Sequence, residues 1–194
     1  MNKEPTEKDP VYWFNKLKTV LINKEKVSSK TYFDYIFNAV SRVDAANSTH
    51  LNADKIGRNE IAKRIVKIPK KRLIEYLKYP KRNNYKIYEI IKARTSAKIR
   101  PRENPSFASK FCNEACFYLF SGTKFEDNFS KYDNIVRKAL PYYATYFNIN
   151  IENLNLEDYY NFQYLIDKIR SKSEIKISRY AFDHLLWYYF KARM

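Results

Sequence analysis

The chain has 194 residues, of which 45% are hydrophobic and 17% aromatic, so it is long and apolar enough for one globular domain with a large core. This composition excludes a disordered chain, and the presence of only two glycines and seven prolines excludes a fold of many short strands, which needs frequent turns. A formal net charge of +16 would attract a polyanion over roughly 8 Å at physiological salt. We therefore expect nucleic acid as the partner, unless the charge only follows from a composition rich in Lys, Asn, Ile and Tyr.

Apolar residues in the first half of the chain recur every three or four positions, which predicts amphipathic helices. Helices are predicted over residues 11–22, 31–46, 71–79 and 85–94. A further helix is predicted to begin at Asp54 as its N-cap and to run through Ile65 and Val66. Pro69 then stops that helix, because a proline disfavours the helical conformation of the residue before it.

The middle of the chain combines a polar stretch with an apolar one. Residues 95–105 are basic and contain two prolines, which predicts a loop. Residues 106–120 are apolar almost all round, which predicts a central buried helix that ends near Gly122. Cys112 and Cys116 are one helical turn apart in this helix, and we expect buried free thiols rather than a disulfide framework or a zinc site.

The last third of the chain predicts three more helices. They cover residues 133–147, with Pro141 as a kink or break, 155–170, and 178–193, which Ser178 caps. The predicted fold is an all-α, multi-helix bundle of eight or nine helices in a single domain spanning residues 1–194. Two helical lobes around a cleft, with the loop 95–105 crossing between them, are the alternative arrangement.

Several classes of site are missing from the sequence. Two glycines cannot build a phosphate-binding loop or a dinucleotide fingerprint, and neither a serine nucleophile elbow nor a paired-histidine metal motif is present. We therefore expect no metal and no cofactor. The polar residues 1–10 predict no signal peptide, and no run approaches the ~18 apolar residues of a membrane span. These patterns predict a cytoplasmic protein without a membrane partner.

Two residues are candidates for chemistry. Lys110 interrupts the apolar run at 106–120, and burial there would lower the pKa of its amine and make it a nucleophile at neutral pH. The alternative is a lysine whose stem packs on the core while its ammonium group stays in water. Asp133 begins the next predicted helix, where an aspartate is also an ordinary N-cap that needs no catalytic role.

The segment 104–140 resembles a known family. Residues 105–112 (PSFASKFC) and 129–140 (FSKYDNIVRKAL) are similar to the hairpin and the downstream aspartate segment of the helix-hairpin-helix DNA glycosylases, the superfamily of 8-oxoguanine DNA glycosylase and endonuclease III. Lys110 falls on the nucleophilic lysine of the family and Asp133 on its catalytic aspartate. Ser106 and Ala108 replace the two hairpin glycines, and the chain lacks the four cysteines of an endonuclease-type iron–sulfur cluster.

This resemblance implies a DNA base-excision repair glycosylase, with or without lyase activity, that flips a damaged base out of the duplex. Lys110 would attack the sugar C1′ and form a Schiff base, and Asp133 would stabilise the cationic sugar. The residues implied to contact DNA are Ser106, Phe107, Ala108 and Ser109 at the hairpin, and Arg100, Arg102, Arg137 and Lys138 at the phosphates.

Two other functions are compatible with the same residues. One is a non-catalytic, basic, helical protein that binds nucleic acid. The other is a helical partner-binding or defence-type protein whose charge is compositional. A steep fall of DNA affinity with salt would distinguish the first of these from the second.

Overall fold

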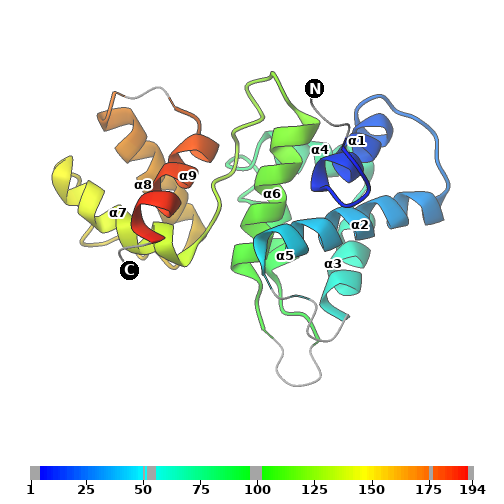
Figure 1. Ribbon diagram of the computed structural model, residues 1–194, viewed down its shortest axis with the longest axis horizontal. Helices are drawn as coiled ribbons and strands as arrows, with labels where there is room; N and C mark the ends of the chain where they lie inside the picture. The colour runs from blue at the N-terminus through cyan, green and yellow to red at the C-terminus, as the bar shows by residue number, and fades with distance from the viewer. Residues whose placement is uncertain (1–4, 50, 52–55, 97–101, 175–176, 192–194) are drawn as a thin grey trace. The chain divides into compact units, whose positions relative to one another are not determined.

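The computed structural model describes residues 5–49, 51, 56–96, 102–174 and 177–191. The described residues form nine α-helices and no sheet, with one isolated β-bridge between Thr95 and Arg102, so the predicted all-α fold is confirmed (Figure 1). Contacts between residues divide the chain into two compact units, Met1–Asn128 and Phe129–Met194. The predicted crossing loop, 95–105, lies within the first unit and not at this division.

Six helices build the first unit. They are α1 (Pro10–Leu21), α2 (Ser29–Asn47), α3 (Ile56–Val66), α4 (Lys70–Lys78), α5 (Lys86–Lys92) and α6 (Pro105–Leu119). Where both ends of a helix were predicted, the observed ends lie within two residues of the predicted ones. Asp54, the predicted N-cap of α3, lies outside the described residues.

Helix α6 is the centre of the first unit, because α1, α2, α4 and α5 all pack against it (Figure 1). Ten of its fifteen residues are buried, as the apolar sequence predicts. Cys112 and Cys116 are buried free thiols, and burial raises the pKa of the Cys112 thiol. The helix ends at Leu119, and Gly122, with φ at 76°, takes a left-handed conformation in the turn that follows.

A buried carboxylate fixes the connection between α2 and α3. Asp44 accepts hydrogen bonds from the Thr49 hydroxyl at 2.5 Å and from the backbone N–H of Leu51 at 3.0 Å. Its Oδ2 also forms an ion pair with the Arg58 guanidinium at 2.7 Å. These partners compensate the desolvation of a residue that is only 2% exposed.

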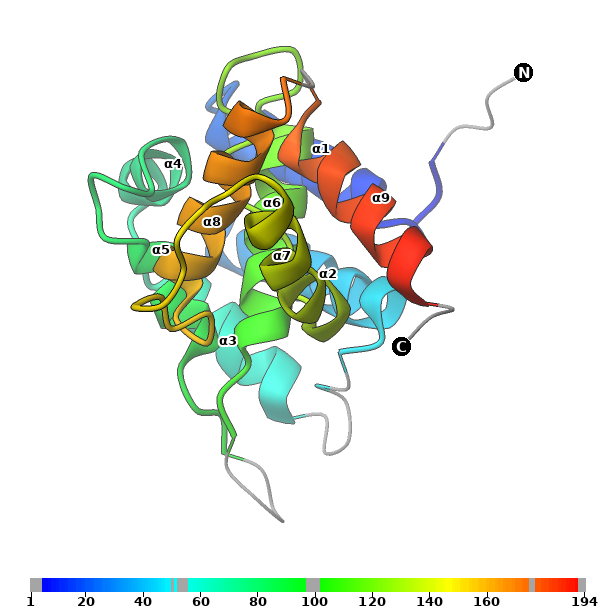
Figure 2. The ribbon, with the colours of Figure 1, turned by 90° about the vertical axis from the view of Figure 1, so that its left-hand side faces the viewer.

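The second unit contains three helices, α7 (Asn134–Tyr146), α8 (Tyr159–Lys172) and α9 (Arg179–Lys191). Helix α7 packs against both of the others and lies between them in Figure 2. It runs through Pro141 without a break. Helix α8 begins four residues later than predicted, because the Asp158 side chain accepts a hydrogen bond from the Asn161 N–H at 2.9 Å and caps the helix there.

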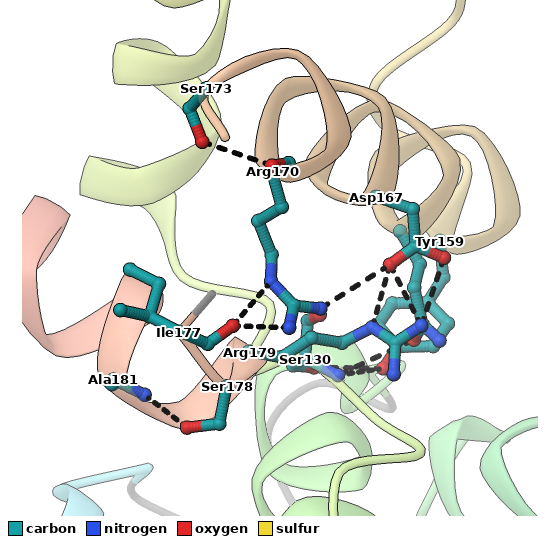
Figure 3. A network of polar contacts seen from close by, with 10 residues as sticks. Ser130, Tyr159, Asp167, Arg170, Ser173, Ile177, Ser178, Arg179 and Ala181 are labelled. Carbon is teal, nitrogen blue, oxygen red and sulfur yellow. Dashed lines mark hydrogen bonds and ion pairs between the residues drawn. The ribbon is translucent and has the colours of Figure 1, made fainter. Parts of the chain in front are cut away.

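Polar contacts tie the segment before α9 to α8, as Figure 3 shows. The Arg179 guanidinium donates from Nε to Asp167 Oδ1 at 2.8 Å and from Nη2 to Oδ2 at 2.9 Å. Arg170 donates from Nε to the Ile177 carbonyl at 3.0 Å. Ser178 accepts from the Ala181 N–H at 3.0 Å, which confirms it as the N-cap of α9.

Candidate functional site

The two predicted catalytic residues belong to different compact units. Lys110 is a part-buried residue of α6 in the first unit. Asp133 is the N-cap of α7 in the second unit, where its Oδ1 accepts a hydrogen bond from the Ile135 N–H at 2.8 Å. This hydrogen bond confirms the capping interpretation of Asp133. The catalytic pairing of Lys110 with Asp133 stays a prediction.

The predicted hairpin residues lie in the first turns of α6, which begins at Pro105. Phe107, Ala108 and Ser109 are each no more than 1% exposed, and Ser106 is part-buried. The Ser109 hydroxyl donates to the Ser106 carbonyl at 2.9 Å. The three buried side chains are part of the core of the first unit, so contact between them and DNA would require them to leave it.

Two of the predicted phosphate-binding arginines already bind other groups of the protein. Arg102 donates to the Thr49 carbonyl at 3.1 Å. Arg137 forms an ion pair with Glu157 at 3.0 Å and donates to the Asn134 side chain at 3.0 Å. Lys138 is exposed, and Arg100 lies outside the described residues.

The densest positive charge lies elsewhere, in residues 63–86, which we call the basic segment. It runs from the end of α3 through α4 to the start of α5 and contains ten lysines and arginines but only one acidic residue, Glu75. Leu73 and Leu77 anchor α4 in the core. The exposed cations of the segment are Lys63, Lys67, Lys71, Arg72, Lys81, Arg82 and Lys86.

Some cations of the basic segment have partners within the first unit. Arg72 pairs with Glu75 at 2.8 Å, and Lys70 lies over the Tyr32 ring at 4.7 Å from its centre. Among the described residues, the structure records no ion pair for the exposed Lys67 and Lys71. A surface with so many cations and so few carboxylates can hold phosphate groups.

An aromatic platform overlaps the basic segment at the end of α4. Tyr79 is 44% exposed, and its ring meets the Phe125 ring edge-on at 5.5 Å between centres. Two ammonium groups lie over Phe125, those of Lys78 at 5.1 Å and Lys124 at 5.4 Å from the ring centre. We call Tyr79, Phe125, Lys78 and Lys124 the Tyr79 platform. It combines an exposed ring with cations, the two groups that stack bases and neutralise phosphates in single-strand binding.

A side-chain amide positions this platform. Asn128 donates through Nδ2 to the carbonyls of Leu77 and Lys78, both at 2.9 Å, so the loop that carries Phe125 is tied to the last turn of α4. The last-turn carbonyls of a helix lack partners within the helix, and Asn128 supplies one. The density of cations in residues 63–86 was visible in the sequence, whereas the pairing of Tyr79 with Phe125 was not.

Comparison of the chain with models of protein families, with curated proteins and with solved structures finds no match. Within the part of the chain that the structure describes, no group of three or more His, Cys, Asp or Glu side chains is placed to hold a metal ion. None of the described helices combines the length and the apolar character that a membrane crossing requires.

Proposed function

We propose that this chain is a non-catalytic nucleic-acid-binding protein that acts through the basic segment and the Tyr79 platform. The observation that carries the proposal is the concentration of ten cations and one carboxylate in residues 63–86, a segment that also contains the exposed ring of Tyr79. We include the predicted cytoplasmic location in this proposal, and the free thiols of Cys112 and Cys116 are compatible with a reducing compartment.

The dimensions of α4 suit a strand of nucleic acid. Its nine residues extend about 13 Å at 1.5 Å per residue, which matches about four phosphates of one strand counted along the axis of a B-form duplex, at 3.4 Å of axis per phosphate. Leu73 and Leu77 hold the helix on the core, so Lys71 and Arg72 can contact phosphates without a change of fold. Such contacts would release counterions and make binding depend steeply on salt.

The uneven charge distribution favours binding over a compositional origin of the charge. Residues 129–194 contain ten lysines and arginines and seven acidic residues, so the second unit is close to balanced. The Lys-rich composition extends over both units, yet the large excess of cations lies in the first. A purely compositional bias gives no reason for this difference.

Equilibrium binding of labelled 20-nucleotide single strands and duplexes, measured by fluorescence anisotropy over a range of salt concentrations, tests the proposal. Affinity should fall linearly with salt on a double-logarithmic plot, with a slope near −0.7 per neutralised phosphate for single strands and −0.9 for duplexes. The double variant Lys67→Gln, Lys71→Gln should reduce the slope for single strands by about 1.4. Tyr79→Ala should weaken single-strand binding by about 1–3 kcal/mol and leave the slope unchanged.

The matched control is the double variant Lys8→Gln, Lys16→Gln, which removes two exposed lysines outside the basic segment and changes the net charge equally. It should keep the slope of the parent protein. An equal reduction of the slope in both double variants would show that only the total charge matters. That result would overturn the assignment of nucleic-acid binding to the basic segment. Absence of salt-dependent binding would overturn the function itself.

A further inference from the structure

The second unit exposes an unusual number of large aromatic side chains. Among the described residues, the second unit contains seven of the eight most exposed large hydrophobic residues, and six of those seven are tyrosines. They are Tyr142 and Tyr146 on α7, Tyr160 and Tyr164 on α8, and Leu185, Tyr188 and Tyr189 on α9. A tyrosine ring offers an apolar face for stacking while its hydroxyl remains in water.

Helix α7 carries the two most exposed of these rings. Tyr142 is 67% exposed and Tyr146 is 78% exposed. Lys138, Tyr142 and Tyr146 follow one another at intervals of four residues, so they form one stripe along the exposed face of the helix. The Tyr142 ring stacks on Phe190 of α9, with 6.3 Å between ring centres, and this contact supports its position. We call these three residues the α7 stripe.

We propose that the α7 stripe binds unpaired bases of a single-stranded nucleic acid, with Tyr142 and Tyr146 stacking on bases and Lys138 binding a phosphate. This inference rests on the proposed function and narrows its ligand from nucleic acid in general to single strands. Positions four residues apart are about 6 Å apart along a helix. A base stacked between the two tyrosine rings requires the rings to be about twice the 3.4 Å rise of stacked bases apart. A small tilt of the two side chains would give this separation.

The charge of this surface favours a polyanion as the occupant. Helix α7 contains no acidic residue, and of its two cations Arg137 is paired with Glu157 whereas Lys138 is exposed. The one acidic residue of α9, Asp183, is only 5% exposed, and Lys191 of that helix lies 4.0 Å from the centre of the Trp187 ring. Figure 2 shows α7 beside α9.

The same spacing recurs on α8. Tyr160, Tyr164 and Lys168 also follow one another at intervals of four residues, and the Lys168 ammonium group lies 5.4 Å from the centre of the Tyr164 ring. Both tyrosines are less exposed than those of α7, at 53% and 43%. A carboxylate, Asp167, adjoins Lys168 in sequence. The α8 tyrosines therefore provide a matched comparison for the tyrosines of α7.

Binding of labelled dT20 and of a 20-base-pair duplex to the full chain tests this inference. The double variant Tyr142→Ala, Tyr146→Ala should lose tenfold or more of its affinity for dT20 and less than twofold for the duplex, because only unpaired bases stack on the rings. Tyr142→Phe, Tyr146→Phe keeps both rings and should keep the affinity. Tyr160→Ala, Tyr164→Ala should lose less affinity for dT20 than the α7 double variant.

The outcomes separate this inference from the proposed function. If the parent protein binds both ligands with a steep salt dependence but the α7 double variant binds dT20 like the parent, the inference fails and the proposed function stands. If the parent binds neither ligand, both fail. If light scattering shows that the parent is a dimer and the α7 double variant a monomer with unchanged dT20 affinity, the α7 stripe binds a second copy of this chain and the inference is overturned.

Discussion

The carboxylate of Asp133 accepts a hydrogen bond from the backbone N–H of Ile135 at 2.8 Å, immediately before the first turn of α7. The first N–H groups of a helix have no partner within it, and a side-chain acceptor at the N-cap satisfies one of them. The aspartate that the glycosylase resemblance assigns to catalysis therefore has a structural role.

Replacement of Asp133 should separate these two roles. Asp133→Ala removes the acceptor and should lower the free energy of unfolding by about 1 kcal/mol, whereas Asp133→Asn keeps an acceptor of similar strength and should lower it less. Urea denaturation of the full chain, followed by circular dichroism, measures both changes. Equal stability of the Ala variant and the parent protein would contradict the capping role.

Lys110 offers a direct test of the glycosylase resemblance. A non-catalytic protein forms no Schiff base, so borohydride treatment with a duplex containing 8-oxoguanine or an abasic site should give no covalent protein–DNA adduct. The control reaction contains Lys110→Gln. An adduct that forms with the parent protein and disappears in Lys110→Gln would contradict the non-catalytic proposal and support the lyase chemistry that the resemblance implies.

Most helices could be predicted because their signals are local. Apolar residues at helical spacing, the prolines at 69 and 80, and the cap at Ser178 each act within one or two turns. The start of α8 was predicted wrongly because the apolar pattern continues into residues 155–158, where the side chains of Asn155 and Asp158 bond to nearby backbone N–H groups. The pattern alone does not show such local competition.

The candidate site depends on longer-range relationships. The cations of residues 63–86 can be counted in the sequence, but their exposure follows from the burial of Leu73 and Leu77 against the core. Tyr79 and Phe125 meet only because α4 packs against α6 and Asn128 ties the following loop to α4. Likewise, the glycosylase resemblance implies that Phe107 contacts DNA, yet Phe107 is buried in the first unit, as the apolar run at 106–120 predicts.

Tyr32 should make the stability of the protein fall at alkaline pH. Its side chain is 5% exposed, its hydroxyl has no hydrogen-bond partner among the described residues, and burial raises its pKa to about 12. The unfolded chain loses this proton near pH 10 and the folded protein only near pH 12. The contribution of Tyr32 to the free energy of unfolding is therefore fully present below pH 10. It is lost between pH 10 and pH 12, and the loss is at most about 2.7 kcal/mol.

The variant Tyr32→Phe isolates this effect, because it keeps the ring beneath Lys70 and removes only the ionisable hydroxyl. Its free energy of unfolding should equal or exceed that of the parent protein at pH 7 and decline less between pH 10 and 12. Tyr160→Phe, at a 53% exposed position, provides the control and should decline like the parent. If the free energy of unfolding declined equally in the parent protein and in Tyr32→Phe, the alkaline loss of stability could not be assigned to Tyr32.

The ion pair between Asp167 and Arg179 should stabilise the second unit locally. Both side chains are largely shielded from water, at 24% and 15% exposed, and two donor–acceptor contacts of 2.8 and 2.9 Å join them. Asp167→Asn leaves the Arg179 charge without its carboxylate and should lower the local stability by about 2 kcal/mol. Glu152→Gln, at an exposed position, removes the same charge and serves as the control.

Hydrogen exchange of the full chain, analysed by mass spectrometry, measures this change helix by helix. A loss of about 2 kcal/mol corresponds to roughly thirtyfold faster exchange of amides that exchange through opening of the second unit. Asp167→Asn should accelerate exchange in α8 and α9 and leave the exchange rates of α1 and α2 as in the parent protein. The control Glu152→Gln should leave the rates of all four helices unchanged. Equal acceleration in α1 and α2 would mean that the two units open together, and unchanged rates in α9 would mean that Ser178 and Arg170 hold the start of α9 without Asp167.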